Sequence, residues 1–169
     1  IDWVIIRENS EGEYSGSGGR VHKGLPEELA TETSVFTRVG VERIHRFAFE
    51  LSRKRPRKLL TLVTKSNAQR HGMVLWDEIF YEVAKKYPDV KTDRMLVDAV
   101  TTRMVLKPES LDTIVASNLH ADILSDLAAA LSGSLGIAPT ANLNPERRFP
   151  SMFEPIHGSA FDITGKGVA

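Results

Sequence analysis

Two aspartates lie four residues apart in the stretch SNLHADILSDLAAAL, residues 117–131. The apolar residues recur as in an amphipathic helix, so Asp122 and Asp126 project from one helical face. Two carboxylates on a half-buried helix repel each other, and burial raises the cost of both charges. A divalent cation that prefers oxygen ligands removes this repulsion. A plainer interpretation remains open, in which one Asp lies near an N-cap and the other is solvated.

A third carboxylate, Asp98, ends the strand-like segment RMLVD, residues 94–98, and the strand-like DTIVAS, residues 112–117, directly precedes the aspartate pair. Open α/β sheets build their sites at the carboxyl ends of parallel strands. Asp98, Asp122 and Asp126 are therefore candidate ligands for Mg²⁺ or Mn²⁺.

Three further side chains could take part in chemistry. Lys65 ends the strand-like KLLTLVTK, where it can act as a base near a metal or simply reach water. The segment RENSEGEY, residues 7–14, carries Arg7 and Tyr14. A guanidinium suits a substrate carboxylate, and a phenol can donate a proton.

The last candidate segment is EPIHGSAFDITGKG, residues 154–167, with His157, Gly158, Ser159 and Asp162. A turn with exposed amides and an acidic residue can hold the adenosine part of a nucleotide, although a plain glycine turn has the same composition. The chain has no G-x-G-x-x-G motif, because GSGG at 16–19 lacks that spacing.

Strand-like and helix-like patterns alternate in the elements that must position these residues, which predicts an α/β fold. We expect strands at 3–6, 31–38, 58–65, 94–100 and 112–117, and helices at 41–51, at 72–87 and after the last two strands. Residues 15–28 are expected to form a glycine-rich loop or extended arm, and the chain from residue 135 onward an irregular segment.

Composition narrows the class of protein. The 169 residues carry 22 basic and 22 acidic side chains, so there is no electrostatic reason to expect nucleic acid or an anionic membrane as partner. Cysteine is absent, and no apolar run reaches the roughly 18 residues of a membrane span. We expect a cytoplasmic protein. Because the chain starts at IDWVIIREN and stops at GKGVA, we also expect an internal segment of a longer chain.

Five segments, taken in order, resemble the β-decarboxylating dehydrogenases, the isocitrate/isopropylmalate dehydrogenase family: RENSEGEYSG, TKSNA, LVDA, SNLHADILSDLAAAL and EPIHGSAFDITGKG. The segments TKSNA, FTRVGVERI and GIAPTANLNPERRFPSMFEPIHGSA look most like its tartrate and D-malate dehydrogenase branch. The resemblance implies the α/β fold of that family rather than a classical Rossmann fold. It also implies a dimerisation and substrate–metal domain over residues 1–132, and the start of a return into the cofactor domain over 133–169.

The resemblance also implies roles for residues. Family members are homodimers with shared active sites, so Lys65 and Asp98 would serve the site of the partner subunit, with Asp98, Asp122 and Asp126 as Mg²⁺ or Mn²⁺ ligands. Lys65 would take the C2 hydroxyl proton and Tyr14 would protonate the enol carbon. The binding residues would be Arg7 and Asn67 for substrate, His157, Gly158, Ser159 and Ala160 for the adenine of NAD, and Asp162 for its ribose.

The implied reaction is a metal-dependent, NAD-linked oxidative decarboxylation of a small 2-hydroxy diacid, D-malate or tartrate. Three alternatives stay open: isopropylmalate or isocitrate as substrate, a non-catalytic metal-binding dimerisation module, and Mg²⁺-dependent phosphoryl transfer, for which no P-loop is present. His120, Ala121 and Phe161 depart from the residues commoner in the family beside these positions.

Overall fold

The computed structural model describes residues 1–155 and 161–167. By its internal contacts the chain divides into two compact units, Ile1–Leu124 and Ser125–Ala169. The expected domains, 1–132 and 133–169, refer to the architecture of the family and stay a prediction. No helix within the described residues is long and apolar enough to cross a membrane.

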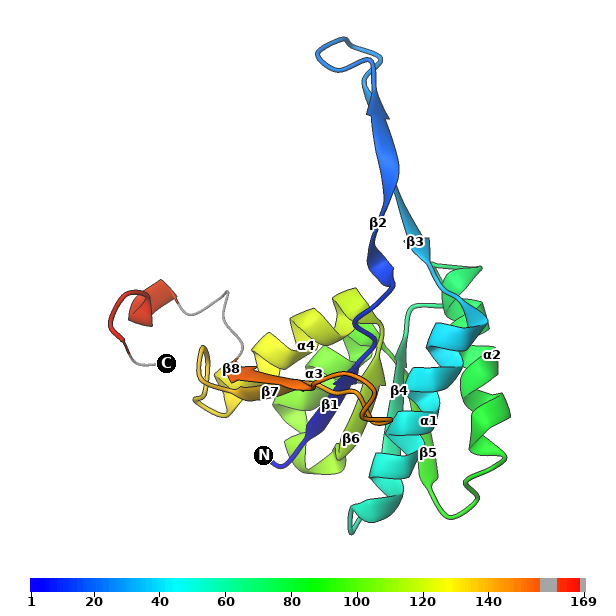
Figure 1. Ribbon diagram of the computed structural model, residues 1–169, viewed down its shortest axis with the longest axis vertical. Helices are drawn as coiled ribbons and strands as arrows, with labels where there is room; N and C mark the ends of the chain where they lie inside the picture. Colours follow the sequence, from blue (N-terminus) through cyan, green and yellow to red (C-terminus); the bar gives the residue numbers. More distant parts are fainter. Residues whose placement is uncertain (156–160, 168–169) are drawn as a thin grey trace. The chain divides into compact units, whose positions relative to one another are not determined.

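A four-stranded parallel sheet forms the centre of the first unit, with the strand order β1-β6-β4-β5 (Figure 1). The strands are β1 (Val4–Arg7), β4 (Leu59–Thr64), β5 (Lys91–Leu96) and β6 (Thr113–Ala116). The central strands β4 and β6 are buried almost throughout, because their apolar and threonine side chains are covered on both faces. The expected α/β fold is confirmed.

Helices α1 (Arg38–Lys54) and α2 (Gly72–Ala84) pack against each other and against the sheet. Their apolar faces form the core with alternate residues of the strands, among them Leu60, Leu62 and Val115. Trp76 and Phe80 of α2 are fully buried, and the Trp76 indole donates a hydrogen bond to the Val63 carbonyl at 3.1 Å. Helix α3 (Val97–Leu106), followed by the short helix η1 (Pro108–Ser110), contacts β4 and β5.

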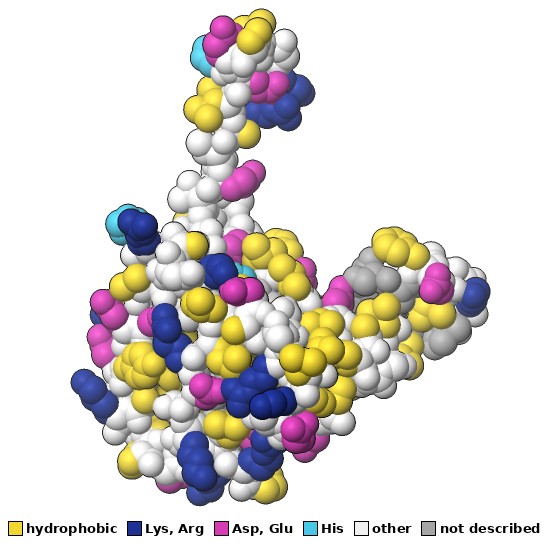
Figure 2. Space-filling view, turned by 180° about the vertical axis from the view of Figure 1, so that it is seen from behind, with side chains coloured by type: hydrophobic (Ala, Val, Ile, Leu, Met, Phe, Trp, Pro, Cys, Tyr) yellow, Lys and Arg dark blue, Asp and Glu magenta, His cyan; other side chains and the backbone are white. Residues whose placement is uncertain are grey.

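Residues 12–35 form an antiparallel hairpin that projects from this unit, made of β2 (Gly12–Val21) and β3 (Leu29–Val35) (Figure 1). The expected arm is therefore a paired ribbon, and nearly all its side chains are exposed. Gly18 permits the pairing, because a Cβ there would lie 2.2 Å from the Thr31 carbonyl oxygen. On the face shown in Figure 2, basic and acidic side chains are interspersed, in keeping with the balanced charge.

Two expectations were wrong. Asp98 does not end a strand, because β5 stops at Leu96 and Asp98 lies in the first turn of α3, where a carboxylate is favoured by the helix dipole. The apolar residues around it suit either structure. In the second unit, the segment expected to be irregular contains the antiparallel strands β7 (Pro139–Asn142) and β8 (Met152–Pro155). Their prolines occupy strand ends, where a ladder N–H can be spared.

Candidate functional site

The carboxyl edge of the parallel sheet collects the candidate residues of the first unit. Arg7 is the last residue of β1, Lys65 follows β4, and Asp98 lies two residues after β5. Helix α4 (Asn118–Leu131) starts two residues after β6 and carries Asp122. The expectation that these side chains gather at strand ends follows from the parallel topology.

Arg7, Tyr14 and Asp122 form one hydrogen-bonded group. Arg7 Nη1 donates to Asp122 Oδ1 at 2.5 Å, and Tyr14 Oη donates to Asp122 Oδ2 at 2.9 Å. The guanidinium also lies 5.6 Å from the centre of the Tyr14 ring, within the range of a cation–π contact. The hydrogen bond to Asp122 raises the pKa of the exposed Tyr14 phenol, and the nearby Asp122 charge adds to this effect. The phenol is thus protonated at neutral pH.

The RENSEGEY segment is tied to the start of α4 by residues that spacing alone did not single out. Asn118 accepts from Arg7 Nε at 2.9 Å and donates to the Glu11 carbonyl at 3.0 Å. The Glu13 carboxylate accepts from Ser117 Oγ at 2.7 Å and from the Leu119 amide at 3.1 Å. Glu13 therefore caps the helix that carries Asp122. The Ser-Asn pair at this strand–helix junction predicts a local N-cap, and nothing in the sequence pointed to Glu13 as the acceptor.

Lys65 and Asp98 form the second pair at the edge. Lys65 Nζ donates to Asp98 Oδ1 at 2.5 Å, with side-chain exposures of 29% and 65%. This hydrogen bond lowers the pKa of Asp98, and a backbone hydrogen bond at Asp98 acts in the same direction. Asp98 is thus a solvent-accessible carboxylate at the carboxyl edge of the sheet.

No group of three acidic or histidine side chains close enough to hold a metal occurs among the described residues of this single chain. Asp122 is bonded to Arg7 and Tyr14, Asp98 is bonded to Lys65, and Asp126 lies one turn further along α4. The metal assignment to the three aspartates stays a prediction.

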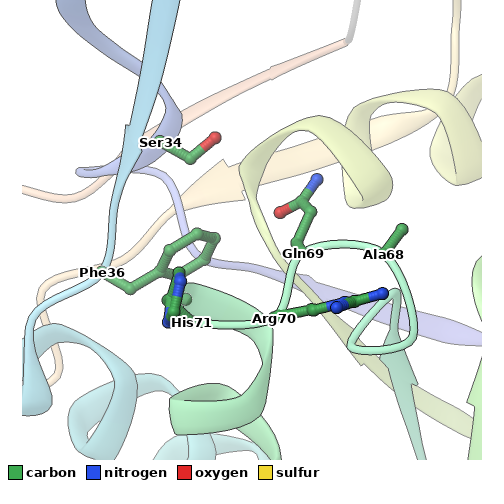
Figure 3. A pocket seen from close by; sticks show the side chains of 7 residues that line it. Ser34, Phe36, Ala68, Gln69, Arg70 and His71 are labelled. Carbon is green, nitrogen blue, oxygen red and sulfur yellow. The ribbon is translucent and has the colours of Figure 1, made fainter.

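Asn67 lies exposed in the turn after Lys65 and makes no side-chain hydrogen bond within the described residues. The turn itself is closed by the amides of Ala68 and Gln69, which both donate to the Lys65 carbonyl at 2.9 Å. Just beyond it is an open pocket of about 460 Å³, lined by Ser34, Phe36 and residues 68–72 (Figure 3). None of the predicted site residues lines this pocket.

His120 is the one departure from the family pattern that is buried with a polar atom unpaired. The side chain is 6% exposed, and its Nδ1 has no hydrogen-bond partner among the described residues. Burial lowers the pKa of His120; the Lys65 charge also lowers it, and the Glu13 charge opposes both. The imidazole therefore lies near both of these site residues. Ala121, the next departure, is fully buried.

The predicted adenosine-binding residues are only partly visible. His157, Gly158, Ser159 and Ala160 lie outside the described residues. Asp162 is exposed in the short helix η2 (Phe161–Ile163), as is the departing residue Phe161. The assignment of these five residues to NAD stays a prediction.

Comparison with known proteins identifies the family to which this fold belongs. All of residues 1–169 match the family described as isocitrate/isopropylmalate dehydrogenase, and the chain belongs to that family. It is 78% identical over its whole length to a probable tartrate dehydrogenase/decarboxylase of Agrobacterium vitis, and 55% identical to the D-malate dehydrogenase [decarboxylating] of Escherichia coli strain K12. In each case it covers 47% of the relative.

A solved structure agrees with these sequence relatives. The crystal structure of isocitrate dehydrogenase from Methylococcus capsulatus superposes with a TM-score of 0.87 at 44% identity, covering 99% of this chain and 48% of that one. The family, its fold and the tartrate and D-malate branch inferred from the motifs are confirmed. The chain spans about half the length of the curated relatives it matches.

Proposed function

We propose that this chain belongs to an enzyme that oxidises and decarboxylates D-malate or tartrate with NAD and a divalent metal ion. The observation that carries the proposal is the bonded group of Arg7, Tyr14 and Asp122 at the sheet edge. It combines a carboxylate binder, a proton donor and a metal-type ligand. The names of the two relatives, a tartrate dehydrogenase/decarboxylase and a decarboxylating D-malate dehydrogenase, support the substrate class.

The donor set suits a hard cation. Asp98 and Asp122 supply carboxylate oxygens, and their side chains are 65% and 41% exposed, so both can be reached from solvent. In this structure Asp98 is paired with Lys65, and Asp122 is paired with Arg7. A bound cation can take the place of the two basic side chains, and a substrate carboxylate can then pair with Arg7. The ion, Mg²⁺ or Mn²⁺, supplies charge stabilisation for the oxyanions of the reaction.

We propose that the active enzyme is a homodimer. In this arrangement Asp122 and Asp126 of one subunit and Asp98 of its partner bind the ion together, and Lys65 crosses to the same shared site. The proposal is supported by the lack of a three-ligand group among the described residues of one chain. It agrees with the exposure of Asp98.

The residues of the chain then have distinct tasks. Arg7 holds a substrate carboxylate, and Asn67 lies beside the substrate and the nicotinamide ribose. Lys65 takes the proton from the C2 hydroxyl, and bound NAD would be the acceptor for the hydride of C2. The resulting oxo acid loses its β-carboxylate as CO₂, which leaves an enol. The Tyr14 phenol then donates a proton to the enol carbon that carried the carboxylate. His157, Gly158, Ser159 and Ala160 line the adenine pocket, and Asp162 binds the adenosine ribose.

The proposal is tested with the purified full-length protein. NADH formation is followed by its absorbance with D-malate, tartrate, isocitrate and 3-isopropylmalate, each with Mn²⁺ and with EDTA. We expect turnover of D-malate or tartrate that EDTA abolishes. Turnover of only isocitrate or isopropylmalate overturns the substrate assignment, and no turnover by a folded dimer favours a non-catalytic module.

The role of Tyr14 is tested by Tyr14→Phe, with Tyr81→Phe on α2 as a matched control. Both side chains are about half exposed, so both variants should keep the wild-type melting temperature. Loss of the phenol should lower kcat by roughly 10²-fold, the usual contribution of a proton donor, and the control should not. Equal activity of the two variants would remove Tyr14 from the mechanism.

A further inference from the structure

We propose that Ser66, Asp77 and Arg94 form a positioning cluster that sets the geometry of the Lys65–Asp98 pair. The inference rests on the proposed function, since it assigns a catalytic task to Lys65. Ser66 Oγ donates to Asp77 Oδ2 at 2.8 Å, and Arg94 Nε donates to the same oxygen at 2.8 Å. Arg94 Nη2 also donates to Ser66 Oγ at 2.7 Å, so the three side chains form a closed triangle.

The cluster joins three elements that meet at the sheet edge. Ser66 belongs to the turn after β4, directly beside Lys65, while Asp77 lies on α2. Arg94 lies in β5, which leads into α3 and Asp98. In the parallel register Leu62 of β4 is opposite Arg94 of β5. Ser66 and Arg94 therefore lie on the two neighbouring segments that lead to Lys65 and Asp98, and Asp77 joins them from α2.

The triangle links the buried charge of Asp77 to the turn that carries Lys65. Asp77 is 13% exposed, and its second oxygen, Oδ1, is buried without a hydrogen bond among the described residues. Its charge is therefore balanced mainly by Arg94, and the Ser66 hydroxyl connects this ion pair to the turn. The Ser66 amide is held separately, by Thr64 Oγ1 at 3.2 Å.

Loss of this connection should affect the chemical step more than substrate binding. Lys65 acts on a proton that moves only in the transition state, whereas Arg7 and the metal ligands bind the substrate in both states. A displacement of a reacting group by about 1 Å can cost roughly 10²-fold in rate. We therefore expect a fall in kcat, measured per folded enzyme molecule, with little change in KM. The correction for the folded fraction is needed because a loss of stability by itself would also lower the apparent kcat.

The test uses the encoded protein at full length in four variants. Ser66→Ala removes the hydroxyl from the turn, and Arg94→Ala disrupts the triangle from β5. Ser66→Thr restores a hydroxyl. Glu82→Gln is the control, because it weakens another arginine–carboxylate pair that involves α2. This pair joins Glu82 of α2 to Arg38 of α1, and neither residue belongs to the turn.

We expect Ser66→Ala and Arg94→Ala each to lower kcat at least tenfold, with KM for the diacid within twofold of wild type. The double variant should lose little more than the worse single one, because the two changes break the same triangle. Ser66→Thr should recover most of the rate, and Glu82→Gln should be unaffected. Hydrogen exchange of the Ala68 and Gln69 amides should quicken in the alanine variants only.

Wild-type kcat in Ser66→Ala and Arg94→Ala overturns the inference, whether or not the amides exchange faster. A fall in kcat of the same size in Glu82→Gln, or a loss of activity that appears mainly as a higher KM, overturns it as well. If the wild-type protein turns over none of the diacids, the proposed function fails by itself. Faster exchange confined to the two alanine variants would then still support the triangle as the anchor of the turn.

Discussion

His45 makes the stability of the protein depend on pH in a way that one substitution removes. The side chain is completely buried in α1, with both ring nitrogens unpaired among the described residues. Its ring packs edge-on against Trp76 at 4.3 Å and Phe80 at 5.3 Å between centroids. Burial lowers the pKa of His45 to about 3, because a charged imidazolium has no water or carboxylate to stabilise it there.

The size of the effect follows from the two pKa values. Between the folded value near 3 and the unfolded value of 6.5, the unfolded chain binds a proton that the folded chain rejects, so stability rises with pH. The contribution is fully present above pH 6.5 and is lost as the pH falls towards 3. A pH of 5 lies about 1.5 units below the unfolded pKa, so protonation of the unfolded chain lowers the unfolding free energy by about 2 kcal/mol.

The assay is urea unfolding of wild type and His45→Leu at pH 8, 7, 6 and 5, with protein concentration held constant. Leucine has a similar size and cannot titrate, so the difference between the two curves isolates His45 from all other groups. We expect the variant to be at least as stable as wild type at pH 8, since two unpaired nitrogens leave the core. Its advantage should grow by about 2 kcal/mol by pH 5. Parallel curves would show that His45 is hydrated or bonded in solution.

Two further predictions concern a buried ion pair and a helix cap that stabilise the first unit. Arg55→Ala should cost about 3 kcal/mol of unfolding free energy in urea titrations, because it leaves the 1% exposed Asp112 without its cation. Arg38→Ala breaks an exposed pair and should leave the midpoint nearly unchanged; equal losses would refute the role of burial. Thr37→Ala should cost about 1 kcal/mol, because its hydroxyl accepts the Gly40 amide at the start of α1. A loss that Thr37→Ser does not recover would show that the cap is not responsible.

Periodicity located the sheet and its helices because their burial is regular. The strand at 58–65 and the helix at 72–87 have apolar residues at the spacing that burial requires, and both occur at β4 and α2. The strand end at Asp98 was misplaced, because Val97 and Ala99 suit a strand or the first turn of a helix. Only the pairing with β4, which stops at Leu96, decides between them.

The sequence named candidate residues for the site but not the contacts between them. Arg7 and Asp122 are 115 positions apart, and their hydrogen bond depends on β1 and β6 being neighbours in the sheet. Motif resemblance named both residues without that knowledge. Ser66 lies inside the TKSNA motif, but neither Asp77 nor Arg94 belongs to a motif. The triangle of the three side chains exists only once α2 and β5 are placed beside the turn.

The projecting hairpin begins inside the site. Strand β2 starts at Gly12, so the helix-capping Glu13 and the phenol of Tyr14 are already part of the ribbon. The hairpin is consequently not an appendage that could be trimmed or exchanged as a module. Any shortened or grafted version must be joined beyond Tyr14, so that Glu13 and Tyr14 keep their hydrogen bonds to the start of α4 and to Asp122.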